Sequence, residues 1–531
     1  MKKIFFILLA AITVSLASCN KDFLETAPTT AVSGDTMLNT EDGGLMALNG
    51  VFRFFWQWGA TTTSNYHQSF GPQSYALMGD LMGEDMVQAA SGNGWFWYDY
   101  CYNVKTRYTS GGWRSYDCWN YYYTIISNVN YILDKENEFK EAGTEISNTW
   151  KYILGNAYAL RAYAYHYLEM TFARSYIGHE DRLGVPIYTE PTVAGTEGQP
   201  RSTNKAVYAQ AVKDIDAAIA YLNGQSKQHV SHIDYYVANG IKARIALYMG
   251  DYTAAYAAAK IAMSASGKNV AFDASQHFND SGASNVLWGA EIITDQGTTN
   301  PQFLAHMDIA FGGYGKASRK CCSAELISKI NAADKRIKWW NYEVLEDGKT
   351  LGYQQYKFLF KDASVPTSGA DHIFMRMPEM YLIAAECACR GAGSGESEAK
   401  SLLNEMMSTR QDGYDCSAKT GTSLGALTTD YTGSLLEEII LQRRIELWGE
   451  YGRIYDIKRL RQGFKRTAAM GHPTAGLLTT LHTDDPESFD WVLTIPSAET
   501  DANPLMVQNP TGSYEADGQG DDPALTPSID K

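Results

Sequence analysis

HIDYYVANGIKARIALYMGDYTAAYAAAKIAMSA, residues 232–265, contains two helical segments separated by a single glycine. The first segment ends at Tyr248-Met249-Gly250, and Asp251-Tyr252 starts the second. Alanines recur at positions 254, 255, 258, 259 and 262, so one side of the second segment can approach another helix closely. A glycine that ends one helix, followed by a tyrosine and alanines that open the next, is the spacing of a tetratricopeptide unit. This stretch therefore predicts a fold built from paired helices.

Helices are also predicted upstream of this pair. Residues 204–222 follow a Ser202-Thr203 cap, residues 113–135 carry an apolar stripe that includes Asn130, and Thr40-Glu41 opens a helix that runs to about residue 58. We expect the Asn130 amide to be buried and hydrogen-bonded, because an unpaired buried amide costs about 1–3 kcal/mol. The strongest helix spans residues 149–173 and has one broad face made of Leu154, Ala157, Tyr158, Arg161, Ala162, Tyr165, Leu168 and Phe172.

Helical periodicity returns at residues 376–390, 396–410 and 434–462. Between these helices and the pair at 232–265, residues 270–370 lose the periodicity and gain glycine, asparagine, serine and aromatic residues, with one short strand predicted at Val286-Leu287-Trp288. The predicted fold class is therefore mainly α: a scaffold of tetratricopeptide-like helix pairs with an irregular, loop-rich half.

The N-terminus has the pattern of a lipoprotein export signal. Lys2 and Lys3 precede an apolar run over residues 4–16, and Leu16-Ala17-Ser18-Cys19 places a cysteine directly after small residues. The run is shorter than the roughly 20 residues of a membrane span. We expect a signal peptide at residues 1–18, lipidation of Cys19, a tether at 19–35, one body at 36–512 and an acidic tail at 513–531. An ordinary secretory signal with a chance cysteine is the alternative.

Charge and cysteine content restrict the partners. The formal net charge of −15 disfavours nucleic acid and anionic lipid surfaces and favours a neutral or cationic ligand. The seven cysteines after Cys19 form no C-x-x-C pair with a second ligand cluster, so zinc is not expected. We expect no cofactor, and a bracing calcium ion is left open. Buried free thiols are the default for these cysteines, with a Cys101–Cys118 bridge as the alternative.

A dense aromatic block is the first candidate binding region. Thirteen of the 29 residues at 95–123 are Trp, Tyr or Phe, and the block follows the turn-rich Ser91-Gly92-Asn93-Gly94. Flat rings pack against the apolar face of a sugar, while amide and guanidinium groups bind its hydroxyls. Trp119 and Tyr123 lie on the helical stripe and are interpreted as core. The ligand candidates are Trp95, Trp97 and Tyr98, with Asn93 and Arg107 as polar contacts.

The irregular half supplies further candidates. Phe311 and Tyr314 lie in a glycine-rich loop that can reach a ligand, whereas Trp288 is interpreted as core and Trp339-Trp340 stays undecided. The carboxylates that a glycosidase would need are present in Asp80, Glu84, Asp85 and Asp99, but their spacing singles out no pair. The charges of 438–459 have helical spacing, which favours ion pairs between helices over catalysis. They include Arg443, Arg444, Glu446, Arg453 and Asp456.

Several motifs in order give the chain a specific resemblance. They are Cys19-Asn20-Lys21-Asp22-Phe23-Leu24-Glu25; Gly79-Asp80; Arg161-Ala162-Tyr163-Ala164-Tyr165-His166; Gly184-Val185-Pro186-Ile187; Arg376-x-Pro378-Glu379-Met380-Tyr381; Glu438-Ile439-Ile440-x-x-Arg443-Arg444-x-Glu446-Leu447; Gly452-Arg453; Asp456-Ile457-Lys458-Arg459; and Ile495-Pro496. From about residue 19 to 512 the chain resembles the RagB/SusD family of outer-membrane nutrient-binding lipoproteins. Residues 85–115 and 265–360 match nothing specific in that family.

The resemblance implies a SusD-like fold of about four tetratricopeptide-like helix pairs, with the first binding loop near the aromatic block. It implies a non-catalytic, lipid-anchored protein at the outer membrane, exposed at the cell surface. Its implied partner is a SusC-like TonB-dependent outer-membrane barrel, to which it would deliver an oligosaccharide. A peptide-capturing protein on the same scaffold is the alternative, followed by a surface glycosidase.

Overall fold

The computed structural model describes residues 37–60, 65–102, 112–273, 275–298, 300–310, 313–344, 350–362, 364 and 370–510. The chain divides into two units, Met1–Ala47 and Leu48–Lys531, and helix α3 (Glu41–Arg53) crosses this division. The descriptions that follow concern the second unit.

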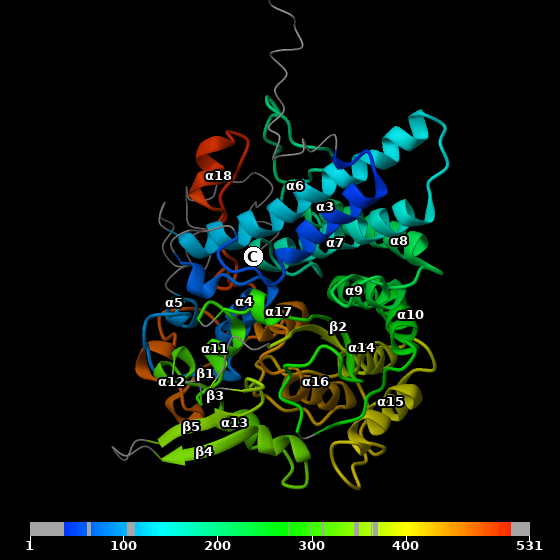
Figure 1. The fold of residues 1–531 in the computed structure, drawn as a ribbon. Helices are drawn as coiled ribbons and strands as arrows, with labels where there is room; N and C mark the ends of the chain where they lie inside the picture. The colour runs from blue at the N-terminus through cyan, green and yellow to red at the C-terminus, as the bar shows by residue number, and fades with distance from the viewer. Residues whose placement is uncertain are drawn as a thin grey trace, which may run out of the picture. The chain divides into compact units, whose positions relative to one another are not determined.

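Long helices pack against one another in the order of the chain (Figure 1). Helices α6 to α10 each contact the next, and α10 then contacts α14, which packs on α15 and α16. Residues far apart in sequence thus continue one helical array, which confirms the mainly helical prediction. The bounds are α6 (Trp113–Glu141), α7 (Asn148–Phe172), α8 (Asn204–Leu222), α9 (Tyr235–Met249), α10 (Tyr252–Met263), α14 (Met377–Cys389), α15 (Glu396–Ser408), α16 (Leu435–Glu446) and α17 (Arg453–Leu460).

Local sequence signals account for the ends of these helices. The Thr203 side chain accepts a hydrogen bond from the Ala206 backbone N–H and caps α8. Gly250 has φ of 77° and ends α9, a conformation that glycine adopts without the steric cost of a Cβ. Asn130 is buried as expected: its amide donates to the Tyr188 and Glu190 carbonyls and accepts from Arg161. That the helix pairs have tetratricopeptide geometry stays a prediction.

The irregular half contains two small antiparallel sheets and short helices. The first sheet has the order β1 (Met86–Gln88), β3 (Lys320–Cys322), β5 (Thr350–Gln355), β4 (Trp340–Val344), and the second pairs β2 (Val286–Ala290) with β6 (His372–Arg376). The other elements are α4 (Pro72–Met82), α5 (Trp97–Tyr100), α11 (Phe303–Met307), α12 (Tyr314–Ala317), α13 (Ala324–Ile327), α18 (Ser497–Ala502), and the 3-10 turns η2 (Tyr66–Gln68), η3 (Thr294–Gln296), η4 (Lys335–Trp339), η5 (Ala468–Met470) and η6 (Thr474–Gly476). Trp288, Trp339 and Trp340 are buried, so all three belong to the core.

The helical order predicted over 434–462 is present but interrupted. The structure has two helices there, α16 and α17, separated by residues 447–452. Two glycines in this break, Gly449 with φ of 80° and Gly452 with φ of 102°, have backbone conformations that other residues rarely adopt. The break lets the start of α17 press against α4, since a Cβ added to Gly79 would lie 3.0 Å from the Gly452 Cα.

Gly452→Ala is expected to destabilise the protein by about 1–3 kcal/mol, because alanine is strained at this positive φ. In addition, its Cβ would lie 2.7 Å from the Tyr455 ring. Chemical denaturation of the two proteins measures the difference. Gly413→Ala is the matched control: its φ is also positive, at 73°, but a Cβ there meets no atom within 4 Å. Equal losses of stability in both variants would show that close packing around Gly452, including the approach of α4 to α17, adds nothing to the cost of the substitution.

Buried ion pairs connect helices across the array, as the charge spacing predicted. Asp456 pairs with Arg443 at 2.8 Å and with Arg459 at 2.7 Å. Arg444 bonds Asp85 at 2.7 Å, and Arg453 bonds Glu84 at 2.9 Å. These contacts join α16 and α17 to the segment after α4.

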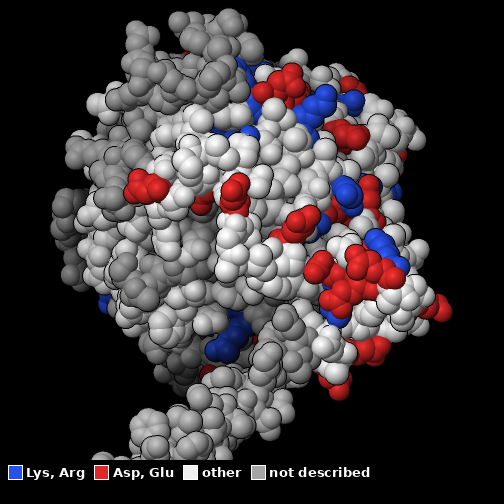
Figure 2. Space-filling view, turned by 90° about the horizontal axis from the view of Figure 1, so that it is seen from above, with Lys and Arg blue, Asp and Glu red and all other residues white. Residues whose placement is uncertain are grey.

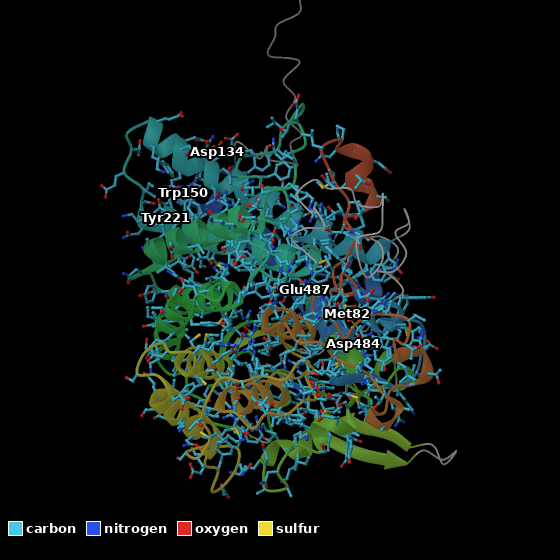
Figure 3. The ribbon with its side chains drawn as sticks, turned by 180° about the vertical axis from the view of Figure 1, so that it is seen from behind. Met82, Asp134, Trp150, Tyr221, Asp484 and Glu487 are labelled. Carbon is cyan, nitrogen blue, oxygen red and sulfur yellow. The ribbon has the colours of Figure 1, made fainter. Side chains whose placement is uncertain are left out.

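The C-terminal segment is joined to the array through Glu487, which Figure 3 labels. Its carboxylate pairs with Arg174 at 2.6 Å and with His179 at 3.0 Å. The hydrogen bond from His179, aided by Arg174, lowers the pKa of Glu487 to about 2. Trp150 and Tyr221, also labelled there, lie where α6, α7 and α8 meet: Trp150 contacts the Phe139 ring and Tyr221 donates to Glu136.

The seven cysteines after Cys19 are free thiols, so the alternative Cys101–Cys118 bridge is not formed. Six of them are buried and Cys101 is half-buried. Within the described part of the chain, no helix combines the length and the apolar character that crossing a membrane requires.

Candidate functional site

Five aromatic side chains from three separate segments form a group that we call the His67 cluster. It consists of Trp58, Tyr66, His67, Trp95 and Tyr314. The His67 ring lies 4.1 Å from Tyr66, stacks on Trp95 at 5.1 Å and meets the edge of Tyr314 at 5.6 Å, measured between ring centroids. The Trp58 side chain is 44% exposed and Tyr66, His67, Trp95 and Tyr314 are partly exposed, so the cluster presents ring surface to solvent.

Hydrogen bonds hold the centre of the cluster. The Tyr314 hydroxyl and His67 Nδ1 are 2.8 Å apart, and His306 Nε2 lies 2.7 Å from the His67 carbonyl oxygen. The His306 ring is buried and stacks on the Tyr314 ring. Burial lowers the pKa of both histidines, so each ring is neutral at pH 7. The cluster therefore offers neutral rings and hydroxyl groups rather than charge.

Backbone contacts position Trp95. Gln88 Nε2 donates to the Trp95 carbonyl, and the Phe96 N–H donates to the Gln68 side-chain oxygen. Phe96 has φ of 59° and is fully buried, whereas its neighbour Trp95 is partly exposed. The turn thus fixes one ring in the core and directs the adjacent ring toward the His67 cluster.

The structure brings together two of the predicted site residues, Trp95 and Tyr314, whose rings are 5.9 Å apart. Trp97 is partly exposed and packs on Tyr100, and like Trp95 it borders the apolar core, so its part in a site stays a prediction. Tyr98 and Asn93 are exposed, and their part in a site stays a prediction. Cys19, Arg107 and Phe311 lie outside the described residues.

Sequence reasoning missed Trp58, Tyr66 and His67. A signal was present, because residues 53–70 contain a second run of aromatic residues beside glycine, serine and asparagine. That run lacks helical or alternating periodicity, so no local pattern assigned its rings to the core or to the surface.

The four carboxylates considered for glycosidase chemistry are buried. Asp99 pairs with Arg114 at 2.9 Å, Asp85 and Glu84 pair with arginines of α16 and α17, and Asp80 accepts from the Arg453 N–H. Burial raises the pKa of Asp80 well above its usual value. These contacts assign the four carboxylates structural roles in the fold. Among the residues with described placement, no three His, Cys, Asp or Glu side chains gather into a group suited to a metal ion.

Comparison with known proteins identifies the family. A profile described as "SusD family" matches residues 235–512, just over half of the chain, and one described as "Starch-binding associating with outer membrane" matches residues 69–247. The chain belongs to the SusD family.

Individual relatives agree with this assignment. SusD-like protein P2 of Formosa agariphila is 38% identical over 96 residues, and SusD-like protein P38 of the same organism is 25% identical over 262 residues. These matches cover 18% and 47% of this chain, and the chain spans only 18% and 43% of the two relatives' lengths.

Solved structures support the fold. A SusD-like carbohydrate binding protein from Bacteroides vulgatus has a TM-score of 0.71 at 22% identity, covering 88% of this chain and 97% of that one. A SusD superfamily protein from Bacteroides thetaiotaomicron has a TM-score of 0.71 at 24% identity, covering 89% and 100%. Surface glycan-binding protein A from Bacteroides uniformis has a TM-score of 0.62 at 18% identity, covering 88% and 99%.

Proposed function

We propose that this protein is a cell-surface lipoprotein of the outer membrane that binds an oligosaccharide at the His67 cluster without cleaving it. It then delivers the ligand to a SusC-like TonB-dependent barrel. The observation that carries the proposal is the convergence of partly exposed rings from residues 58–67, 95 and 314 in a member of the SusD family.

The chemistry of the cluster suits a sugar. Sugar rings have apolar C–H faces that pack on Trp and Tyr, and hydroxyls that exchange hydrogen bonds with groups such as the Tyr314 hydroxyl. The neutral His67 leaves the cluster without a formal charge, so it gives no advantage to a phosphorylated or sulfated ligand. Neutral oligosaccharides are therefore the ligand class that we expect.

The positions of four carboxylates support binding rather than catalysis. Hydrolysis of a glycosidic bond requires two carboxyl groups on opposite sides of that bond. Asp80, Glu84 and Asp85 are buried against the backbone or the guanidinium groups of α16 and α17, and Asp99 is buried against Arg114. We therefore expect no turnover of a bound oligosaccharide.

Anchoring and delivery complete the proposal. The export pattern that ends at Cys19 supports attachment to the membrane by lipid, and the profile match at 69–247 supports an outer-membrane setting. Co-purification of the barrel with the full-length protein from outer membranes tests the partnership.

Trp95→Ala is expected to abolish retardation of the protein, produced from residue 20 onward, in native gels that contain the recognised polysaccharide. Loss of a stacking ring costs about 0.5–1.5 kcal/mol per contact, which is a loss of affinity of about two- to twelvefold for each contact. Tyr314→Phe, which keeps the ring and removes the hydroxyl, should weaken retardation less. Tyr235→Ala is the control, because Tyr235 is also partly exposed but lies at the start of α9.

Circular dichroism and thermal melting of each variant separate loss of binding from loss of folding. Unchanged retardation in Trp95→Ala would remove the His67 cluster as the site. Heat released on adding peptides, without retardation by any glycan, would move the protein to peptide capture. Released sugars after incubation would instead establish a glycosidase.

A further inference from the structure

A groove on the helical array lies outside the His67 cluster. It has a volume of about 430 Å³ and is formed by α6, the segment 188–198 and the start of α18. We call it the α6 groove. Figure 1 shows α18 beside the first half of α6. The volume is within the roughly 300–1,000 Å³ that is common for small-molecule sites.

One face of α6 supplies the floor of this groove. Tyr116, Asn120, Tyr123 and Ser127 follow one another at three- and four-residue steps, which places them on one side of the helix. The Tyr116 side chain is 41% exposed, so ring surface is open to solvent at one end.

The remaining rings of the groove are held in place. Trp119 lies 4.8 Å from Tyr123 and meets Phe172 edge-on, which fixes the indole from behind. Tyr123 donates to the Pro186 carbonyl, and its ring meets the edge of Tyr188 at 5.9 Å. The Trp119 and Tyr123 rings are therefore held in fixed positions at the floor of the groove.

Polar groups surround these rings. Asn120, Thr124 and Ser127 contribute amide and hydroxyl groups from α6, and the opposite walls add Thr192, Thr196, Glu197 and Glu499. The charged side chains that line the described groove are thus the two glutamates, which disfavours an anionic ligand.

Charged side chains are unevenly spread over this side of the molecule. Figure 2 looks down on the side of the molecule where α6 and α18 lie in Figure 1. The described lysine, arginine, aspartate and glutamate side chains gather mainly toward one side of this view, and much of the remaining described surface is uncharged.

We propose that the α6 groove is a second, independent binding site for a neutral oligosaccharide. Aromatic rings beneath amide, hydroxyl and carboxylate groups form the combination that contacts both the C–H face and the hydroxyls of a sugar. The proposal deepens the proposed function and rests on it for the ligand class. It shares no residue with the His67 cluster, so the two sites can be altered independently of each other.

Calorimetric titration with maltoheptaose, cellohexaose, laminarihexaose and xylohexaose tests this proposal. Thr124→Trp fills the groove with a large side chain, and Tyr116→Ala removes its exposed ring. Asn128→Trp is the matched control, because Asn128 is exposed on the same helix and does not line the groove. Each variant is first checked for an unchanged thermal unfolding transition.

We expect the wild-type protein to bind two molecules of the recognised oligosaccharide, and Trp95→Ala and Thr124→Trp to bind one each. The double variant should bind none, and Tyr116→Ala should weaken the second site by about tenfold. Asn128→Trp should behave as wild type.

One bound molecule in the wild-type protein, lost in Trp95→Ala and retained in Thr124→Trp, would overturn the α6 groove and leave the proposed function intact. Loss in Thr124→Trp with full binding in Trp95→Ala would support the groove and remove the His67 cluster. Heat from none of the four oligosaccharides, together with crystals soaked in maltose that show no sugar in the groove, would overturn the groove. If those crystals show maltose at the His67 cluster and none in the α6 groove, the groove is overturned as a binding site and the proposed function stands.

Discussion

Glu446→Gln is expected to destabilise the protein by about 3–5 kcal/mol, the range for breaking a buried ion pair. Glu446 is fully buried at the end of α16 and bonds three arginines: Arg410 at 2.9 Å, and Arg336 and Arg376 at 3.1 Å each. Although burial alone would raise its pKa, the three guanidinium groups hold the pKa of Glu446 well below its usual range.

The size of the effect follows from what the substitution leaves behind. Glutamine has almost the same shape as glutamate, so packing changes little and the lost charge accounts for the result. Arg336 keeps Asp334 and Arg376 keeps Glu450 as partners. For Arg410, by contrast, the described acidic partner is Glu446. In the Glu446→Gln variant its guanidinium therefore keeps a positive charge in the core without a counter-charge.

Equilibrium unfolding in guanidinium chloride measures this loss, with Asp412→Asn as the control. Asp412 is 88% exposed and pairs with Lys335 at 3.3 Å, a surface contact worth about 0–1 kcal/mol. A loss below about 1 kcal/mol in Glu446→Gln would show that the arginines find other partners and that the four-residue network adds little stability.

The helical scaffold was predictable because each helix carries its signal locally. The cap at Thr203, the glycine at 250 and the apolar face of residues 149–173 each depend on neighbours within a few positions. That the charged residues of α16 and α17 form ion pairs was predictable for the same reason, because their helical spacing is a local pattern. Their partners were not, because Asp85 and Glu84 lie about 360 residues earlier in the chain.

The strand predicted at Val286-Leu287-Trp288 is confirmed as part of β2, but the other strands and the pairing within both sheets were not predicted from local pattern. Strands β1 and β3 have three residues each, are buried throughout and join Met86 to Cys322. So short a strand shows no alternation, and its pairing is decided by contacts across the fold. The break at 447–452 was missed because the apolar spacing continues through it while two glycines change the backbone direction.

The candidate site was predicted in part. Ring chemistry and flanking turns selected Trp95 and Tyr314, but the sequence does not show that His67 lies between them. Trp119 and Tyr123 were interpreted as core. Trp119 is 6% exposed, which agrees with that interpretation. Both rings nevertheless line the α6 groove, because the neighbouring elements do not cover this stripe of the helix completely.

The second large effect is expected in acid: the melting temperature should fall steeply between pH 6.5 and 5. Burial lowers the pKa of His166, His232 and His472 to about 3 and that of His372 to about 4. In the unfolded chain these residues titrate near 6.5. Between the two values the unfolded state binds more protons, so the free energy of unfolding falls as the pH is lowered.

Three buried carboxyl groups act in the opposite direction. Burial raises the pKa of Glu169 to about 8, that of Asp80 well above its usual value and that of Asp85 above its usual value, so the folded state holds their protons where the unfolded state releases them. Acidification toward pH 5 therefore stabilises the protein through these three groups. The four histidines outnumber them, and each proton in the difference changes stability by about 1.4 kcal/mol per pH unit.

Further loss is expected below pH 4.5. Despite its burial, Arg453 and Arg444 lower the pKa of Glu84 to about 2, and Glu487 also has a pKa of about 2. Carboxylates with lowered pKa values contribute stability that is present above their unfolded value and is lost as the pH falls toward 2. Acid thus removes stability first through the histidines and then through these ion pairs.

His166→Phe isolates one histidine in this profile. The His166 ring packs among Tyr167, Tyr208 and Tyr248; phenylalanine keeps a ring in this place but removes the hydrogen bond between His166 Nδ1 and the Tyr208 hydroxyl. Thermal melting from pH 7.5 to 4.5 should show a shallower slope in this variant, by about one proton. His482→Gln, a change at an exposed histidine, is the control variant. Equal slopes in all three proteins would mean that His166 is not buried as a neutral ring, and the acid sensitivity would then have to come from the remaining histidines.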